Sequence, residues 1–131
     1  MNTKDVAKTF VRRVWDEKDV SAIDDLVHKE AVLHSILGNF HGCEAMKKVV
    51  RTWLAGFPDL VVKNVAFICE DDLVAVHWQA QGSHQGEFKG INPTGKPVSY
   101  AGVTIYHIKE GKIVEYWAYL DMQHVLEQLR K

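Results

Sequence analysis

The first part of the chain carries apolar and charged residues at the spacing of amphipathic helices. Between Val6 and Trp15 the apolar side chains recur every three or four positions with charged residues between them, which predicts a helix with one buried face. A second, short helix is predicted to begin at residues 21–24, which form a capping pattern, and a third covers residues 43–55. A short extended segment is predicted over residues 31–37.

Beyond Pro58 the period of the pattern changes to about two, and valine, isoleucine, tyrosine and tryptophan become frequent, which predicts strands. The predicted strands cover residues 60–70, 73–88, 97–108 and 112–119, and a short helix follows them. Gly82, Gly86 and Gly102 interrupt these strands and indicate a bent sheet. Helices followed by an antiparallel meander are typical of an α+β domain. We therefore expect one domain over residues 1–131, in which helices and a curved antiparallel sheet enclose a hollow for a small molecule.

Composition changes this picture little but excludes several partners. The 131 residues are 47% apolar and 25% charged, which is ordinary for a soluble globular protein. A formal net charge of -1 gives no basis for binding nucleic acid or an anionic membrane. No apolar run could cross a bilayer and the polar N-terminus is unlike a signal peptide, so a cytoplasmic location is expected. Cys43 and Cys69 are expected to be free thiols, and the seven histidines show no metal-binding spacing, so no metal is predicted.

Three segments carry a family resemblance. Residues 82–96 read GSHQGEFKGINPTGK, residues 111–121 read GKIVEYWAYLD, and residues 57–60 read FPDL after the third predicted helix. In this order, along nearly the whole chain, they resemble the SnoaL-like polyketide cyclases of the nuclear transport factor 2-like superfamily. The resemblance implies a cone-shaped α+β barrel, a homodimer formed through the sheet, and a small apolar or aromatic carbonyl compound as the partner.

The resemblance also places a general acid/base at Asp121, after the last strand. In the chemistry it implies, the carboxylate removes a proton next to a carbonyl, the carbanion attacks a second carbonyl, and the acid protonates the new oxygen without metal or cofactor. An ordinary carboxylate is a weak base at neutral pH, so a dry apolar wall would have to raise its pKa. The alternative is that Asp121 only caps the C-terminal helix, because aspartate is a preferred N-cap.

The alternation of side chains along the strands predicts the surroundings of Asp121. If the last hairpin turns at Glu110-Gly111 without a bulge, Trp117 and Asp121 share one face with Tyr100 of the neighbouring strand. Tryptophans on the helices and on the second strand would add ring edges to the same hollow. The predicted substrate-binding residues are Trp15, Trp53, Trp78, Tyr100 and Trp117.

Two histidines join Asp121 as candidate catalytic residues. His84 lies between glycines in the shared motif and could orient a substrate carbonyl or bond to the acid. His34, on the short extended segment, could reach the same hollow and pair with a carboxylate. For both, a histidine that faces solvent or has only structural partners is the alternative.

The sequence leaves other functions open beside a cofactor-free cyclase or isomerase. A ligand-binding or purely structural dimer of the same fold would lack productive chemistry. An epoxide hydrolase would need an arginine between two acids, and all four arginines fall on predicted helices. A site like that of ketosteroid isomerase would need a protonated acid beside a buried tyrosine, and no second aspartate lies on a predicted strand.

Overall fold

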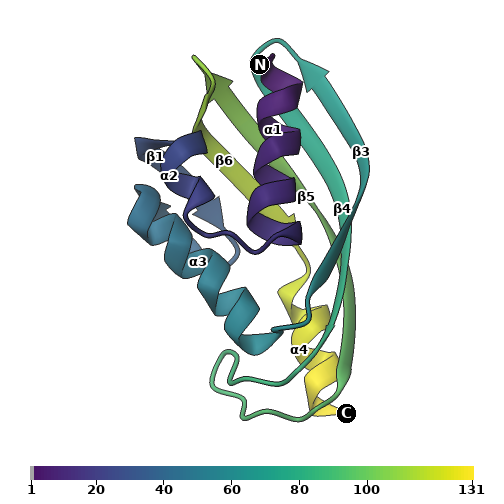
Figure 1. Ribbon diagram of the computed structural model, residues 1–131. Coiled ribbons are helices and arrows are strands. Elements are labelled where there is room, and N and C mark those ends of the chain that lie inside the picture. The colour runs from purple at the N-terminus through teal and green to yellow at the C-terminus, as the bar shows by residue number, and fades with distance from the viewer. Residues whose placement is uncertain (1) are drawn as a thin grey trace.

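Six strands form one curled sheet in the computed structural model of the chain, which describes residues 2–131 (Figure 1). Their order across the sheet is β2-β1-β6-β5-β4-β3. The strands are β1 (Val27–Ser35), β2 (Gly38–His41), β3 (Val61–Glu70), β4 (Leu73–Ser83), β5 (Pro97–Lys109) and β6 (Lys112–Leu120). The predicted α+β class is confirmed, but the barrel stays open because β2 and β3 remain as two edges.

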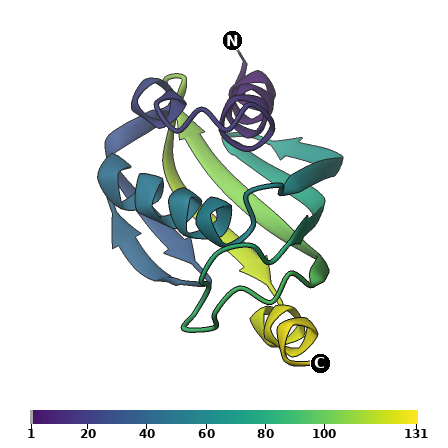
Figure 2. The same cartoon turned by 60° about the horizontal axis from the view of Figure 1, so that its bottom comes forward.

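Three helices cover the concave face of the sheet, and a fourth lies beyond one end of it, within the described chain (Figures 1 and 2). The helices are α1 (Thr3–Val11), which continues into the π-helical turn η1 (Arg12–Asp16), α2 (Ala22–Leu26), α3 (Cys43–Gly56) and α4 (Met122–Arg130). The side-chain amide of Gln128 bonds both the N–H and the C=O of Ser99 at 2.9 Å. The helix α4 therefore occupies the place beside β5 that β6 leaves when it ends.

The four long strands pair antiparallel in sequence order, as predicted, but β1 pairs with β6 in parallel. His34 of β1 lies opposite Trp117 of β6 in this parallel pair. Residues 31–35 of the segment predicted over 31–37 are thus part of a longer strand that extends the sheet, and residues 36–37 form the turn to β2. Its direction could not be predicted, because the connection through α3 and β3–β5 is not encoded in a local pattern.

A bulge in β6 decides which side chains of this strand face the helices. Ile108 of β5 pairs with Ile113 of β6. His107, which precedes Ile108 in β5, pairs with Glu115, so Val114 is an extra residue in β6. Beyond such a residue every side chain of the bulged strand lies on the opposite face from the one a regular ladder would give.

The apolar core consists of two clusters along the axis of the cone. One cluster joins α1 and α2 to the sheet around Phe10 and Tyr106, and the other joins the end of α3, the β4–β5 loop and α4 around Phe57. Trp15 and Trp78 pack against both clusters. The space between the clusters is therefore bordered by large aromatic rings.

The β4–β5 loop closes the end of the cone near α4. The second long strand ends at Ser83 rather than at Phe88, and residues 84–96 pass beneath the C-terminal end of α3 (Figure 2). Phe88 is 1% exposed, and its ring packs against Trp53 and Phe57 at centroid distances of 4.9 and 5.1 Å. The part of the shared motif that was predicted to be strand is thus an anchored loop.

Candidate functional site

A cavity of about 80 Å³ lies between the helices and the inner face of the sheet. Its lining comes from α1, η1, α3 and all strands except β2. Among the lining residues, all of which belong to the described chain, none is acidic or basic, and none is a histidine or a cysteine. An apolar wall without charge favours a neutral molecule, because an ion would lose its hydration there without gaining a partner.

Small side chains on neighbouring strands create the space for this cavity. Ala80, Thr104 and Ala118 face inward from β4, β5 and β6. A Cβ on Gly102 would lie 2.5 Å from the ring of Trp78, so glycine allows this ring to lie close to the sheet. The Trp78 Nε1–H donates to Thr104 Oγ1 at 2.9 Å, which fixes the ring as one wall of the cavity.

Three tyrosines, Tyr100, Tyr106 and Tyr116, line the cavity. Burial raises the pKa of Tyr116 to about 12 and raises the pKa of Tyr100 and Tyr106 beyond that, so all three are neutral at physiological pH. The Tyr106 hydroxyl has Thr104 as a hydrogen-bond partner. The hydroxyls of Tyr100 and Tyr116 make no hydrogen bond within residues 2–131, so a ligand can accept from them.

Four of the five predicted substrate-binding residues lie on the cavity wall: Trp15, Trp53, Trp78 and Tyr100. Trp15 comes from the π-helical turn η1, a local widening of the helix that is frequent near functional sites. Tyr100 contacts two of the others, since its ring stacks on Trp53 at 5.3 Å and meets the Trp78 ring edge to face at 5.8 Å. What these four residues bind stays a prediction.

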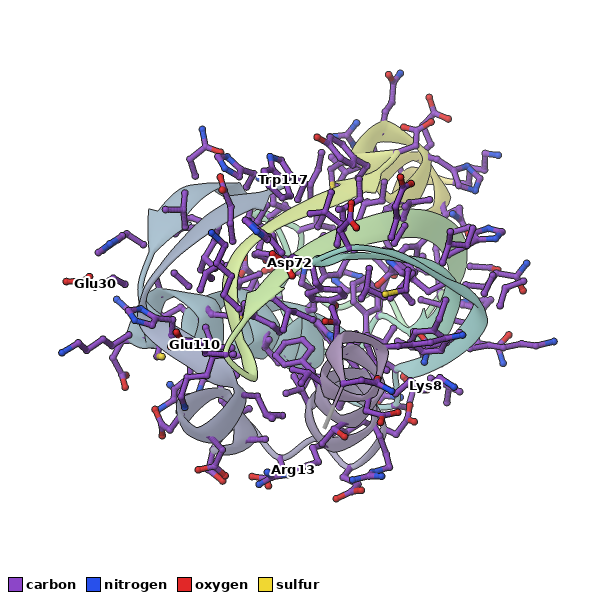
Figure 3. The ribbon with its side chains drawn as sticks, turned by 90° about the horizontal axis from the view of Figure 1, so that it is seen from above. Lys8, Arg13, Glu30, Asp72, Glu110 and Trp117 are labelled. Carbon is purple, nitrogen blue, oxygen red and sulfur yellow. The ribbon has the colours of Figure 1, made fainter. Side chains whose placement is uncertain are left out.

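The fifth residue, Trp117, lies on the face of the sheet that points away from the helices (Figure 3). Because of the extra residue in β6, Trp117 pairs with Ile105 instead of Thr104. The prediction that Trp117 shares a face with Tyr100 is therefore wrong. The bulge brings Tyr116, the residue before Trp117, into the cavity instead.

Asp121 lies outside the cavity as the N-cap of α4. Its Oδ1 accepts a hydrogen bond from the backbone N–H of His124 at 3.1 Å, and the residue is exposed. Leu120 is the last residue of β6 to line the cavity, and Asp121, which follows it, is not among the lining residues. The predicted placement of this carboxylate in a water-poor hollow is wrong, and its position is that of the capping alternative.

His34 also lies on the outer face of the sheet rather than in the hollow. Its Nε2 is 2.7 Å from Oε2 of Glu115, and its ring stacks on Trp117 at a centroid distance of 5.4 Å. The predicted pairing with a carboxylate is present, but both partners point away from the cavity because they follow the outward positions of β1 and β6. This contact is only partly buried.

His84 is completely buried but does not line the cavity. Its Nδ1 accepts from the backbone N–H of Thr94 at 3.2 Å, and its own backbone bonds Lys96 O at 2.9 Å and Gly95 N at 2.8 Å. Its ring packs against Phe57 at 5.7 Å. These contacts hold the two ends of the β4–β5 loop together, while the buried Nε2 has no hydrogen-bond partner among the described residues. A catalytic role of His84 stays a prediction.

Sequence reasoning missed five polar residues of the cavity wall: Ser35, Asn64, Thr104, Tyr106 and Tyr116. Strand alternation along residues 97–108 puts Tyr106 on the same face as Tyr100, and that shared face was the available signal. A regular ladder without the bulge at Val114 would place Tyr116 on the outer face, so the sequence pattern gave no signal for it. A second bulge follows Asn64 in β3, and no residue pattern there announces it.

An open cone of curled sheet and helices around a central cavity is the architecture of the nuclear transport factor 2-like superfamily. Within it, residues 5–129 match the SnoaL-like polyketide cyclases, and the chain belongs to this family.

Solved structures with the same architecture span nearly the whole chain. AclR of Streptomyces galilaeus, a proposed hydroxylase, is 30% identical with a TM-score of 0.86 over 98% of this chain and 95% of its own. A proposed polyketide cyclase of Acidithiobacillus ferrooxidans is 26% identical with a TM-score of 0.84 over 98% and 94% of the two chains. IdmH of Streptomyces antibioticus, another proposed polyketide cyclase, is 25% identical with a TM-score of 0.83 over the full length of both. The comparison with curated proteins finds no match.

Two further observations concern membranes and metals. None of the helices within residues 2–131 has the length and apolar character that a membrane span requires. In the same part of the chain, no group of three or more histidine, cysteine, aspartate or glutamate side chains is placed to hold a metal ion.

Proposed function

We propose that this protein binds a small, neutral, mostly apolar carbonyl compound in its central cavity, with the carbonyl oxygen accepting from a tyrosine hydroxyl. The observation that carries this proposal is the pair of cavity tyrosines, Tyr100 and Tyr116, whose hydroxyls lack a partner among the described residues. A carbonyl is the complementary group, because it is a neutral acceptor that needs no counter-charge. Family membership agrees, since polyketides are rich in carbonyls.

The size of the cavity limits the ligand. Sites for drug-sized molecules usually measure about 300–1,000 Å³, whereas this cavity measures about 80 Å³. A molecule with one ring is therefore the largest that fits without rearrangement. A polycyclic substrate would require side chains at the partly exposed rim, such as Trp15 and Ile36, to move outward.

The chemistry that such a site supports is polarisation of the bound carbonyl. A neutral phenol donates a hydrogen bond that strengthens as negative charge develops on the carbonyl oxygen in an enolate-like transition state. The effect is large in a dry site, because few other dipoles screen it. A cofactor-free isomerisation or aldol closure would use this stabilisation, and the base would have to come from outside the cavity wall.

The second candidate assigns that base to Asp121, as expected for a cyclase. One observation favours it: Asp121 directly follows Leu120, which lines the cavity at the end of β6. The carboxylate would have to leave its hydrogen bond to the His124 N–H and turn inward. An Asp121→Asn variant keeps an N-cap side chain and removes the base, so lost turnover with unchanged stability would support this candidate.

The binding proposal is tested with phenol-to-phenyl variants and a simple aryl ketone. Acetophenone is titrated into the wild type and into Tyr100→Phe and Tyr116→Phe by calorimetry. At least one variant is expected to bind about 5- to 10-fold more weakly, the typical value of one neutral hydrogen bond. Tyr119→Phe is the matched control, because Tyr119 is 56% exposed on the outer face. Equal affinity in all four proteins, or no binding, would contradict the proposal.

We also propose that two copies associate through the outer face of the sheet. This face lies away from α1, α2 and α3, with α4 only at one end beside β5, and it carries exposed apolar side chains such as Ile68 at 67% and Val103 at 37%. An uncovered apolar face of this kind is typical of association sites. Light scattering is expected to give a dimer for the wild type and a monomer for Ile68→Asp, and a monomeric wild type would overturn the proposal.

A further inference from the structure

Asn64 is the one amide side chain on the cavity wall of the described protein, and a bulge in β3 places it there. Asn64 pairs with Trp78 of β4, and the next paired residue of β3 is Ala66, opposite His77. The unpaired residue between them, Val65, is 47% exposed and points outward. Bulges of this kind occur next to functional sites, where they redirect a side chain.

The amide of Asn64 has no hydrogen bond to any of residues 2–131. Its Oδ1 is completely enclosed and unpartnered. An enclosed polar atom without a partner lowers stability, whereas a leucine of similar volume would avoid this desolvation cost. An unpartnered polar group in a cavity wall lowers the stability of the ligand-free protein. Such a group is expected to gain a hydrogen-bond partner when a ligand occupies the cavity.

We propose that Asn64 hydrogen-bonds a hydroxyl group of the bound molecule, which makes the ligand a hydroxy-substituted or enolised carbonyl compound rather than a plain ketone. This inference rests on the proposed function, because the tyrosines bind the carbonyl end. A hydroxyl fits an amide well, since each group both donates and accepts. Rotation of the terminal amide about its soft, roughly two-fold torsion presents either its oxygen or its nitrogen to the ligand.

The positions of the polar groups fit one small ring with two substituents. Trp78 lies between them, as the neighbour of Asn64 across β3 and β4 and as the edge-to-face partner of Tyr100. A flat ring that packs along Trp78 would therefore have Asn64 near one end and a tyrosine hydroxyl near the other. The amide also explains why the wall needs no charged residue to select a hydroxyl.

The test compares para-hydroxyacetophenone with para-methylacetophenone, which have nearly the same shape and differ in the hydroxyl. Both are titrated into the wild type and Asn64→Leu by calorimetry. The wild type is expected to prefer the hydroxy compound by about 10-fold, and Asn64→Leu is expected to lose or reverse this preference. Val62→Leu is the matched control, because it enlarges the next inward side chain of β3 without removing a polar group, and it should shift both affinities by the same factor.

A second measurement separates a ligand-binding role from a structural one. Asn64→Leu is expected to unfold at the same or a higher urea concentration than the empty wild type, because it removes an unpartnered amide. A large loss of stability would show that the amide supports the fold and would overturn the inference. Equal preference for the two ketones in the wild type would also overturn it, while leaving the binding proposal intact. Failure of both ketones to bind would instead contradict the proposed function.

Discussion

Phe88→Ala is expected to destabilise the protein strongly, because Phe88 anchors the loop that closes one end of the cone. The ring is 1% exposed and packs against Trp53 and Phe57. It also lies against the backbone of Gly56, where an added Cβ would be 3.0 Å from the Phe88 ring. Truncating a fully buried phenylalanine usually costs about 3–5 kcal/mol through lost burial and an unfilled cavity. Domains of this size are stable by about 5–15 kcal/mol in total, so the loss is a large fraction.

The same substitution is expected to weaken ligand binding in the protein that remains folded. Trp53 lies between Phe88 at 4.9 Å and Tyr100 at 5.3 Å, and both Trp53 and Tyr100 line the cavity. Without Phe88 behind it, the Trp53 ring gains room to move away from Tyr100. The cavity is then less well defined before binding, and ordering it reduces the affinity.

Urea unfolding followed by tryptophan fluorescence and circular dichroism measures the effect of Phe88→Ala. The midpoint should fall while the slope stays the same, because the surface exposed on unfolding is nearly unchanged. Asn92→Ala is the control in the same loop, where an exposed side chain is expected to matter by less than about 0.5 kcal/mol. A loss below about 1 kcal/mol for Phe88→Ala would refute the view that this loop is a fixed part of the core.

Three further predictions concern single side chains. Burial raises the pKa of Tyr116 from 10.0 to about 12, so its contribution to stability is complete below pH 10 and is lost as the pH rises toward 12. In urea titrations, Tyr116→Phe should reduce the alkaline loss of unfolding free energy by about 3 kcal/mol. Asp121→Ala should lower the free energy of unfolding by about 1 kcal/mol and Asp121→Asn should not, if the aspartate is a cap. Gly102→Ala should cost about 1–3 kcal/mol, because the added Cβ would meet the Trp78 ring at 2.5 Å, and a wild-type melting curve would contradict that contact.

Much of the fold could be predicted because its elements have strong local patterns. The helix over 43–55 and the long antiparallel strands follow directly from apolar periodicity. The second long strand was predicted to reach Phe88, because this apolar residue continued the pattern. The strand ends at Ser83, and Phe88 is buried in the loop that follows. The parallel pairing of β1 with β6 is a long-range feature, and residues 31–37 alone contain no information about it.

The candidate site was harder to predict, because it depends on the face to which each strand residue points. Trp15, Trp53 and Trp78 could be assigned as large inward residues of regular elements, and they do line the cavity. The assignments on β6 failed together, since one extra residue at Val114 moved all of them to the other face. Such a bulge depends on the twist of the whole sheet, which a single sequence does not reveal.

The bulge at Val114 determines what chemistry the cavity can support. In a regular ladder Glu115 would point inward with Trp117, and the cavity would contain a carboxylate beside aromatic rings. The bulge instead turns Glu115 outward, where His34 is 2.7 Å away, and brings the Tyr116 phenol inward. A phenol with a raised pKa can donate to a carbonyl but cannot act as the base at neutral pH. If Asp121 is the base, as the second candidate proposes, its carboxylate has to leave a cap worth about 1 kcal/mol and enter an apolar wall. Binding energy from the substrate then has to support that movement.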